Sequence, residues 1–376
     1  MKVGFKNSIL VLIITLALCE VVSRYFIHVK FNAPIWQSSR IIYAFYPELQ
    51  LLPDSLNKGK INILILGGSA VTDTLSHISR NVTKELNRHG LEVDIFNLSQ
   101  FAHTSFDSRI KFKHCKGLNF NYVFVYDGIN DTRANNCPEN IFREDYSHIH
   151  FYSQVNIFER HPEIKYFTLP FVLDYCWNEL KIKLGWKKTI PKEYFVVNEK
   201  LIGSDSMIAA HNNKENLGAI KAFINKNRDK VIGSDLMIID SLWWAEGVNI
   251  KSAKSFRNNL LYIYRVKCSE TKLILTEYAW YQPLDYSLKK FLYTKMDYAQ
   301  QRWPTELFGD PQNVIKGINC HNRIIDSIVR EHPDIVHFNL NDSIPHNGNY
   351  FDDICHLADS GQVLLGTILS KEIIQH

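Results

Sequence analysis

The sequence predicts a three-layer α/β fold in which helices cover both faces of a central parallel sheet of about five strands. One observation is the run at 61–66, which is nearly all apolar and is followed by glycine. Short apolar runs bounded by turn residues are typical of strands buried on both faces, as in a parallel sheet. A second observation is that such runs alternate with helical stretches. This alternation predicts right-handed crossovers between parallel strands.

The individual elements follow from the same patterns. The expected strands are 61–66, 93–98, 122–126, 272–276 and 335–339, and the expected helices are 76–89, 105–118, 311–331 and 359–374. Between 142 and 270 the alternation is lost over a long, aromatic-rich stretch. Because a compact domain rarely carries so long a loop without a function, we interpret this stretch as an insertion that forms a lid or a substrate-recognition subdomain.

The N-terminal segment, 1–30, predicts a membrane helix. An apolar run covers 9–19. A span of roughly 20 residues is reached over 8–28 if Glu20 and Arg24 lie near its far end, where long side chains can reach the interface. We expect an uncleaved signal anchor, while a cleaved signal peptide or a buried core helix would give a similar pattern.

Positive charge sets the expected orientation of this helix. Lys2 and Lys6 precede the apolar run, which favours a cytoplasmic N-terminus and places the rest of the chain outside the cytoplasm. Residues 31–60 are expected to be a connector, because prolines break this stretch and turn-like residues end it. The folded domain is then expected at 61–376, with the insertion at 142–270.

Composition narrows the class of protein. The 376 residues are 45% hydrophobic and 22% charged, which excludes disordered and collagen-like chains. The net charge is +4 and no dense Lys/Arg run occurs, so we expect no nucleic-acid partner. The seven cysteines include no C-x-x-C pair, which argues against a zinc ribbon or a thioredoxin-type site and leaves any disulfide pairing open. The oligomeric state is also left open.

Functional residues are expected where strands end, because ligands of open parallel sheets bind at the carboxyl ends of the strands. Ser69 directly follows Gly67 and Gly68 after the first strand. A serine at such a turn exposes its hydroxyl beside a helix N-terminus, which suits a nucleophile, although serine is also a common helix N-cap. The glycine pattern of a phosphate loop is absent, which argues against nucleotide binding.

Two further segments carry candidate chemistry. Gly128 and Asn130 follow the third strand. The glycine permits close approach of another part of the backbone, and the Asn130 amide N–H₂ can donate to an oxyanion. An ordinary turn explains the two residues equally well. Asp353 and His356 precede the last helix, and residues three apart on one helical turn can face the same way. The carboxylate would then orient the imidazole as a general base. A helix-capping Asp and a surface His would give the same sequence pattern. Asp352 is the alternative carboxylate.

Taken together and in this order, these segments resemble the SGNH/GDSL hydrolase family. The resemblance covers about 61–135 and 270–376 and implies a flavodoxin-like α/β fold. It also implies a triad of Ser69, Asp353 and His356, with Asp353 preferred over Asp352 because the family motif is D-x-x-H. The first segment reads Gly-Gly-Ser rather than Gly-Asp-Ser, which makes this a divergent member. The G-x-S-x-G elbow of α/β-hydrolases is not met.

The resemblance also implies an oxyanion hole. Its donors would be the backbone N–H of Ser69, the side chain of Asn130 and a backbone N–H after the second strand, with Gly128 in a supporting role. The third donor falls on Ala102, where the family usually has Gly. Alanine keeps the N–H but does not adopt a positive φ cheaply.

The expected function is hydrolysis of a carboxylic ester through an acyl-Ser69 intermediate, for example removal of O-acetyl groups from a glycan. Acyl transfer by the same site and a catalytically silent binding protein are the alternatives. No cofactor and no metal are expected: His148, His150 and His161 lack supporting ligands at metal-site spacing. The adjacent Trp243 and Trp244 could stack on sugar rings, although such pairs more often combine core and surface positions.

Overall fold

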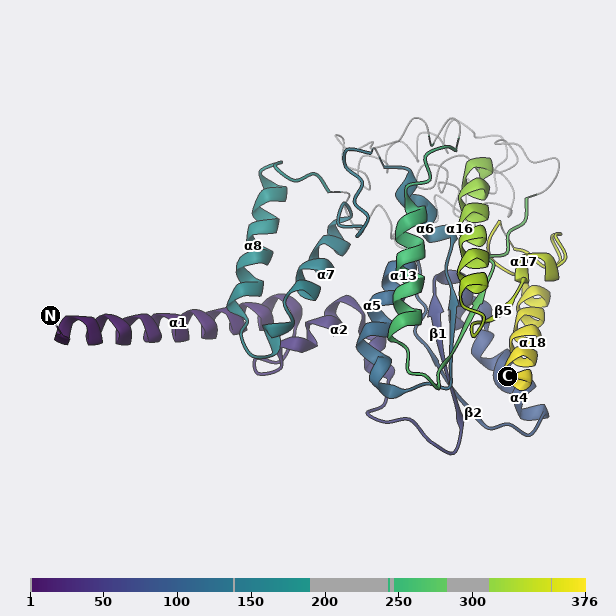
Figure 1. Cartoon of the computed structure of the whole chain (residues 1–376), viewed down its shortest axis with the longest axis horizontal. Helices are drawn as coiled ribbons and strands as arrows, with labels where there is room; N and C mark the ends of the chain where they lie inside the picture. The colour runs from purple at the N-terminus through teal and green to yellow at the C-terminus, as the bar shows by residue number, and fades with distance from the viewer. Residues whose placement is uncertain (1, 138, 190–242, 244–246, 283–310, 353) are drawn as a thin grey trace, which may run out of the picture. The chain divides into compact units, whose positions relative to one another are not determined.

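The computed structural model describes residues 2–137, 139–189, 243, 247–282, 311–352 and 354–376 (Figure 1). The chain forms two compact units. The first comprises Met1–Leu51 and Asp145–Ile190, and the second comprises Leu52–Glu144 and Pro191–His376. Each unit is described separately below.

The second unit is built on a five-stranded parallel sheet in the order β2-β1-β3-β4-β5. Its strands are β1 (Ile61–Gly67), β2 (Val93–Asn97), β3 (Tyr122–Tyr126), β4 (Lys272–Thr276) and β5 (Val336–Phe338). This is the order of the flavodoxin-like fold, so the predicted fold class is confirmed. The strands start within one residue of their expected positions.

Burial explains why these segments form the sheet. In the register, Leu64 of β1 lies between Phe96 of β2 and Val123 of β3. The residues of β3 are all buried, and those of β1 are buried from its second residue onward, as their continuous apolar runs predict. The edge strand β2 is only half-buried and carries Asp94, which pairs with Lys60 Nζ at 2.9 Å.

Helices cover both faces of this sheet. The helical elements of the second unit are η3 (Ser69–Val71), α3 (Asp73–Ser76), α4 (Ile78–Arg88), α5 (Ser105–Cys115), η4 (Lys116–Leu118), α6 (Ile129–Thr132), η5 (Arg133–Asn135), α13 (Ser252–Val266), α16 (Pro311–Glu331), α17 (Leu340–Ser343) and α18 (Asp359–Gln375). Helix α4 packs against α18, whereas α13 packs against α5 and α16. Because right-handed crossovers run in opposite directions from β1, these two groups cover opposite faces and give three layers.

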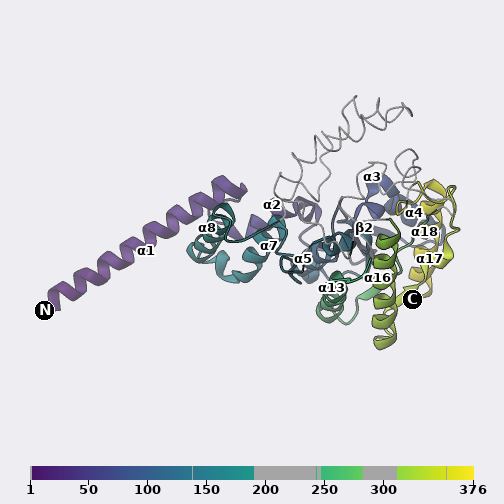
Figure 2. The same cartoon turned by 90° about the horizontal axis from the view of Figure 1, so that it is seen from above.

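The first unit is helical (Figure 2). Its elements are α1 (Lys2–Phe31), η1 (Ser38–Ile41), α2 (Ile42–Phe45), η2 (Pro47–Leu51), α7 (His150–Arg160), η6 (Pro162–Lys165) and α8 (Leu169–Lys183). By length and composition, Asn7–Phe31 could cross a membrane. The C-terminal part of α1 packs on α8 through an aromatic cluster, with Phe31 and Tyr175 rings 5.3 Å apart.

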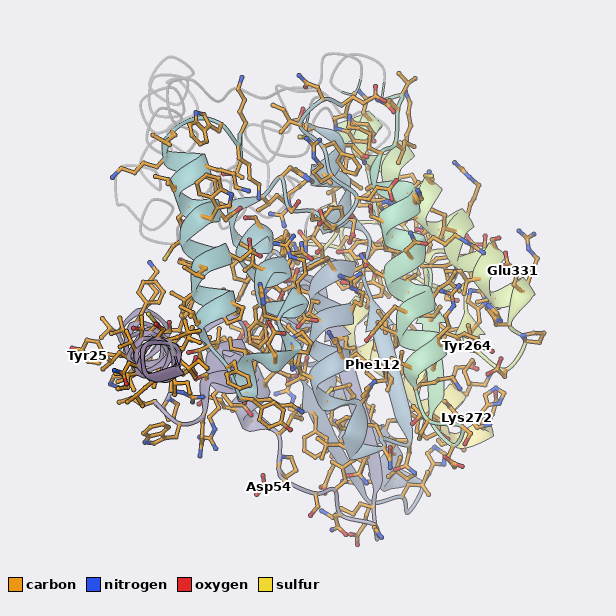
Figure 3. All side chains as sticks on the ribbon, turned by 60° about the vertical axis from the view of Figure 1, so that its left-hand side comes forward. Tyr25, Asp54, Phe112, Tyr264, Lys272 and Glu331 are labelled. Atoms are coloured by element: carbon orange, nitrogen blue, oxygen red, sulfur yellow. The ribbon has the colours of Figure 1, made fainter. Side chains whose placement is uncertain are left out.

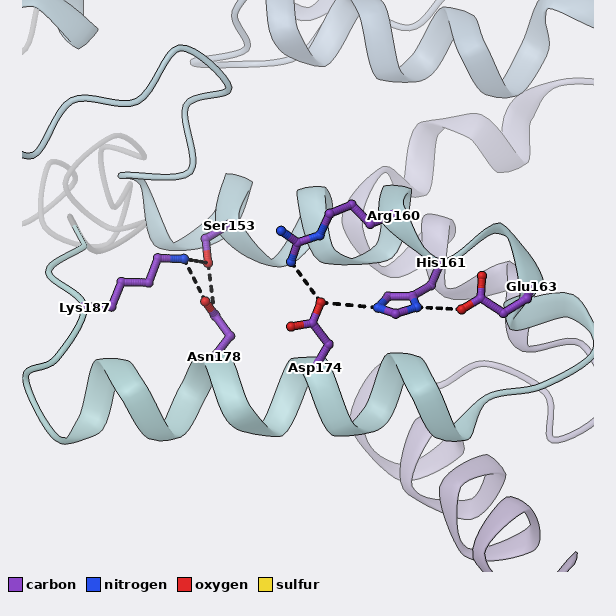
Figure 4. Close-up of polar contacts among 7 residues, drawn as sticks. All are labelled: Ser153, Arg160, His161, Glu163, Asp174, Asn178 and Lys187. Carbon is purple, nitrogen blue, oxygen red and sulfur yellow. Dashed lines mark hydrogen bonds and ion pairs between the residues drawn. The ribbon is translucent and has the colours of Figure 1, made fainter. Parts of the chain in front are cut away.

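Polar contacts join α7 and α8 in the first unit, as Figure 4 shows. Asn178 donates to Ser153 Oγ at 3.0 Å, and Arg160 pairs with Asp174 at 2.9 Å. The stretch from Asp145 to Ile190 therefore folds as a helical pair within this unit. Most of the remaining insertion lies outside the described residues, and so does the segment expected to form a lid.

Glu20 and Arg24 of α1 have binding partners that the sequence did not predict. The Glu20 carboxylate accepts from the backbone N–H groups of Thr168 and Leu169, at the start of α8. Arg24 is buried, pairs with Glu20 at 2.8 Å and donates to the carbonyl of Tyr166 at 2.6 Å. Both charges are thus bound by the protein itself, which offsets the cost of placing them on an apolar helix.

Candidate active site

Ser69 lies directly beyond the carboxyl end of β1, at the first position of the short turn η3. Its Oγ lies 2.8 Å from His356 Nε2, so the structure brings these two predicted residues together. They are 287 positions apart in the chain. Both side chains are half-buried, which leaves the pair accessible to a substrate. A serine hydroxyl on an imidazole nitrogen is the arrangement that activates a serine nucleophile.

The loop that carries His356 is closed by backbone contacts rather than by a helical turn. Phe351 and Leu357 form an antiparallel bridge, and the N–H of Asp352 donates to the carbonyl of His356 at 2.9 Å. Residues 354–356 are a bend, so the helical turn expected here does not form among them. A hairpin-like loop fixes the imidazole because its ends are paired, whereas α18 starts only at Asp359.

On the far side of the imidazole, His356 Nδ1 lies 3.5 Å from the buried Cys355 Sγ. Asp353 lies outside the described residues. Its alternative, Asp352, is exposed. The carboxylate partner of His356 therefore stays a prediction.

Asn130 lies on α6, just past β3, and its side chain is close to Ser69's neighbour Gly68. A Cβ atom on Gly68 would lie only 2.4 Å from Asn130 Nδ2, so a side chain at position 68 would displace the amide. Nδ2 donates one N–H to the carbonyl of His103 at 2.8 Å, which fixes the amide plane. An Asn side-chain nitrogen carries a second N–H.

The loop after β2 brings Ala102 to the same edge of the sheet. Ala102 has φ 62°, in the left-handed region that favours glycine. Ala102 therefore adopts the positive φ that is energetically unfavourable for alanine. Holding a non-glycine residue in this region costs on the order of 1 kcal/mol and requires other contacts to fix it.

Arg133 supplies such contacts, and sequence analysis missed it. The side chain is buried and donates through Nη2 to the carbonyl of Ala102 and through Nε to the carbonyl of Asn130 at 3.3 Å. One guanidinium thus ties the loop after β2 to helix α6. The only local signal was an arginine in the segment that follows a buried strand, and that does not reveal which carbonyls it binds.

His321 of α16 is a second residue that sequence analysis missed. It is fully buried, and its Nδ1 lies 3.1 Å from the carbonyl oxygen of Gly128. Because a carbonyl only accepts, Nδ1 carries the proton and Nε2 accepts from Ser252 Oγ at 2.8 Å. Burial lowers the pKa of His321 to about 4, which keeps the ring neutral. The ring also stacks on Phe256 at 4.4 Å.

Gly128 itself permits close packing. A Cβ at position 128 would lie 2.9 Å from the Cβ of Tyr278. The Tyr278 ring stacks on Tyr126 at 4.6 Å. The glycine therefore lets an aromatic side chain from beyond β4 approach the segment that carries Asn130.

Buried carboxyl groups lie behind this edge. Asp131 is buried and accepts from the backbone N–H and the hydroxyl of Ser105, at the start of α5. Asp127 is also buried, and burial together with the nearby Asp131 carboxylate raises its pKa well above the usual range. We interpret Asp131 as a structural link between α6 and α5.

The remaining sequence candidates lie elsewhere. Trp243 is fully buried, which excludes it as an exposed stacking platform, and Trp244 lies outside the described residues. His150 binds Glu179 at 2.9 Å. His161 binds Glu163 and Asp174 through its two different ring nitrogens. In the part of the first unit that the structure describes, these two histidines therefore bind carboxylates of α8 and η6.

No protein-family model and no curated protein sequence match the chain. Solved structures similar to it include carbohydrate esterases and a lipase. A family 3 carbohydrate esterase from Clostridium thermocellum is 12% identical, with a TM-score of 0.37 over 84% of this chain and 96% of its own. An acetyl-xylooligosaccharide esterase from Geobacillus stearothermophilus is 10% identical, with a TM-score of 0.39 over 85% and 96%. A lipase from a goat rumen metagenome is 9% identical, with a TM-score of 0.38 over 83% and 97%. These values assign neither a family nor a substrate, and the likeness is one of overall fold.

Proposed function

We propose that this protein hydrolyses carboxylic esters through an acyl-Ser69 intermediate. The observation that carries the proposal is the 2.8 Å contact between Ser69 Oγ and His356 Nε2 at the carboxyl edge of a parallel sheet. A serine beside an imidazole has an ordinary structural explanation as well. Here the neighbouring Asn130 amide and the left-handed Ala102 add donors for an oxyanion at the same edge.

In the proposed reaction, Ser69 Oγ–H donates to His356 Nε2 while Nδ1 carries its own proton. The oxygen attacks the ester carbonyl, and the proton moves to His356 as the C–O bond forms. The tetrahedral oxyanion accepts from the Asn130 amide and from the backbone N–H groups of Ser69 and Ala102. His356 then protonates the leaving alcohol, and water repeats the sequence on the acyl enzyme. By resemblance, Asp353 stabilises the imidazolium.

The proposed substrate is a small acyl ester such as an O-acetyl group on a glycan, and the motive is the expected position of the catalytic unit outside the cytoplasm. The same acyl-Ser69 could be intercepted by a sugar hydroxyl instead of water. Following a labelled acetyl group in the presence and absence of a glycan acceptor separates the two reactions. Acetate release that an acceptor leaves unchanged supports hydrolysis.

A fluorophosphonate probe tests the nucleophile. We expect the full-length chain to be labelled and Ser69→Ala not to be, because the probe reacts with an activated serine oxygen. Ser269→Ala removes an exposed serine far along the chain and should leave labelling intact. Equal labelling of the wild type and Ser69→Ala would overturn the proposal.

Esterase assays on purified variants test His356 as the general base. His356→Ala is expected to lower hydrolysis of p-nitrophenyl acetate on the order of 10³-fold or more, because Ser69 loses its proton acceptor. Asp353→Asn is expected to lower the rate far more than Asp352→Asn. The reverse order would assign the carboxylate to Asp352.

We also propose that α1 crosses a membrane and that the catalytic unit lies outside the cytoplasm. Exposed apolar residues cover α1 from Ile9 to Leu18, and Glu20 and Arg24, which follow them, are bound by α8 and its neighbours. Exposed aromatic side chains surround this level of the helix. They are Tyr25, Trp36, Tyr166 and Phe167, at 62%, 77%, 65% and 63% exposure, and Tyr25 is labelled in Figure 3. Aromatic rings of this kind are enriched at membrane interfaces.

A further inference from the structure

Three polar side chains converge in the second unit, away from Ser69. Glu277 directly follows β4, His337 is the middle residue of β5, and Asp326 lies on α16. One carboxylate oxygen of each acid and one ring nitrogen of His337 all lie within 4.8 Å of one another. His337 Nε2 is 3.0 Å from Glu277 Oε1. The sequence offered no motif here, because these residues are up to 60 positions apart.

The second oxygen of Glu277 is the unexplained atom of this cluster. Glu277 is 3% exposed, and its Oε2 is buried with no hydrogen-bond donor among the described residues. The nearby Asp326 side chain can donate to Glu277 only when it carries a proton. Two carboxylates at this separation repel each other unless a cation or a shared proton lies between them. A buried ionised oxygen without a partner costs several kcal/mol, so one of the two is required.

The ligand set indicates which cation would suit. One imidazole nitrogen and two carboxylate oxygens favour zinc and its first-row neighbours, whereas magnesium and calcium prefer oxygen alone. Zinc lies about 2.0–2.2 Å from such ligands, which places the ligand atoms of a tetrahedral site roughly 3.3 Å apart. The 3.0 Å between His337 Nε2 and Glu277 Oε1 is close to that separation. Asp326 and His337 are half-buried, so water can complete the coordination from the solvent side.

We propose that Glu277, Asp326 and His337 bind a divalent transition-metal ion, with zinc as the best fit. The ion would join β4, β5 and α16. Helix α16 also carries His321, which binds the carbonyl of Gly128 beside the Ser69 site. Coordination of Asp326 would therefore stabilise the helix that positions this edge of the sheet. The ion has a structural role and takes no part in the proposed ester hydrolysis.

His161 in the first unit provides an internal contrast. It also has two carboxylate partners, but Glu163 lies at its Nδ1 and Asp174 at its Nε2, at 2.7 and 3.2 Å (Figure 4). The two ring nitrogens point in different directions, so these oxygens do not converge on one point. His161→Gln is therefore a matched control that removes a carboxylate-bound histidine without touching the proposed ligands.

The test is zinc binding by the full-length chain in detergent after chelator treatment, measured by competition with a chromophoric chelator. We expect the wild type and His161→Gln to bind one zinc ion tightly. Asp326→Asn and His337→Gln should each weaken binding about tenfold or more, because even an outer-shell partner of a metal ligand contributes that much. Zinc should also raise the Tm of the wild type but not that of the two ligand variants.

Two outcomes would overturn the metal site. One is the absence of stoichiometric zinc binding by the wild type, which would leave a shared proton between the two carboxyl groups. The other is equal zinc affinity in the wild type and both ligand variants. If a variant loses its far-UV circular dichroism signal, the visible spectrum of the wild type with bound cobalt replaces the comparison. A site of this kind gives visible d–d absorption, and the absence of that absorption would refute the proposal. Because the readout is binding, failure of the esterase proposal would not affect it.

Discussion

The Asn130 amide lies against the residue before Ser69 because residue 68 has no side chain. The Asn130 amide occupies the space where a Cβ of residue 68 would stand, and His103 holds the amide there through its carbonyl. Position 68 therefore requires glycine because of the neighbouring Asn130 amide. The backbone angles do not require it, since a φ of −89° is open to any residue.

Gly68→Ala is expected to reduce ester hydrolysis by roughly 10²–10³-fold, because the added methyl group pushes the proposed oxyanion donor out of place. Fluorophosphonate labelling of Ser69 should slow as well. Gly117→Ala is the matched control, since a Cβ at position 117 meets nothing within 4 Å. Steady-state kinetics with p-nitrophenyl acetate give the comparison. Normal kcat/KM in Gly68→Ala would argue against a role for Asn130.

At the residue level, local patterns predicted candidates but not their contacts. The positions of Ser69 and His356 followed from short motifs and from a family resemblance, and the structure brings the two side chains together. Arg133 and His321 could not be found in this way, because their roles depend on the distant carbonyls of Ala102 and Gly128. His321 lies 193 positions from Gly128. The partners of Glu20 and Arg24, at Thr168 and Tyr166, could not be found for the same reason, because they lie far along the chain.

Among the elements, α16 links the core of the sheet to the candidate site. Asn322 accepts from the N–H of Tyr278 and donates to its carbonyl, while His321 holds Gly128. Two neighbouring side chains of one helix thus fix the segments that follow β3 and β4. The helix is long and strongly patterned, which is why its bounds, Pro311–Glu331, were predicted from the sequence.

His321 makes the stability of this unit depend on pH. Its folded pKa of about 4 lies below the usual value of 6.5, so the unfolded chain binds a proton first as the pH falls. The contribution is fully present above pH 6.5 and is lost between 6.5 and 4, to a total of about 3 kcal/mol. Urea unfolding at several pH values measures it.

His321→Gln should be less stable at neutral pH and should show a flatter pH dependence between 6.5 and 4. His114→Gln changes an exposed histidine on α5 and should keep the wild-type slope. If the slope of His321→Gln equals that of the wild type, the histidine is not buried in the neutral form.

The strands and the irregular segments differ in how far sequence determines them. Continuous apolar runs such as those of β1 and β3 leave a strand buried on both faces as the only arrangement that removes all their side chains from water. The loop that carries His356 contains no such run. It is shaped by the bridge between Phe351 and Leu357, and the periodicity of apolar residues does not predict this pairing.

For the whole molecule, the proposed arrangement is a membrane helix followed by a catalytic unit outside the cytoplasm. In bacterial cells that express the full chain, we expect it to resist alkaline carbonate extraction. Protease added to spheroplasts should remove a C-terminal tag. Replacing both Leu12 and Leu16 by Lys should release the protein from the membrane, since each lysine costs about 2.5–3.5 kcal/mol at a helix centre.

Val363→Lys serves as the control, because it adds a charge at an exposed position of α18. This variant should remain in the membrane. A C-terminal tag that stays protected in spheroplasts but is digested in lysed cells would reverse the proposed orientation.

The separation of 287 positions between Ser69 and His356 also sets an order on the protein's synthesis. Synthesis must pass residue 356 before the imidazole exists, and helix α18 packs against α4, with Gly366 in close approach to Asn81. A nascent or prematurely terminated chain would carry the serine without its base. The proposed enzyme is therefore inert until this part of the chain has been made, and the serine becomes reactive only once the His356 loop and α18 have packed against the segment that contains α4.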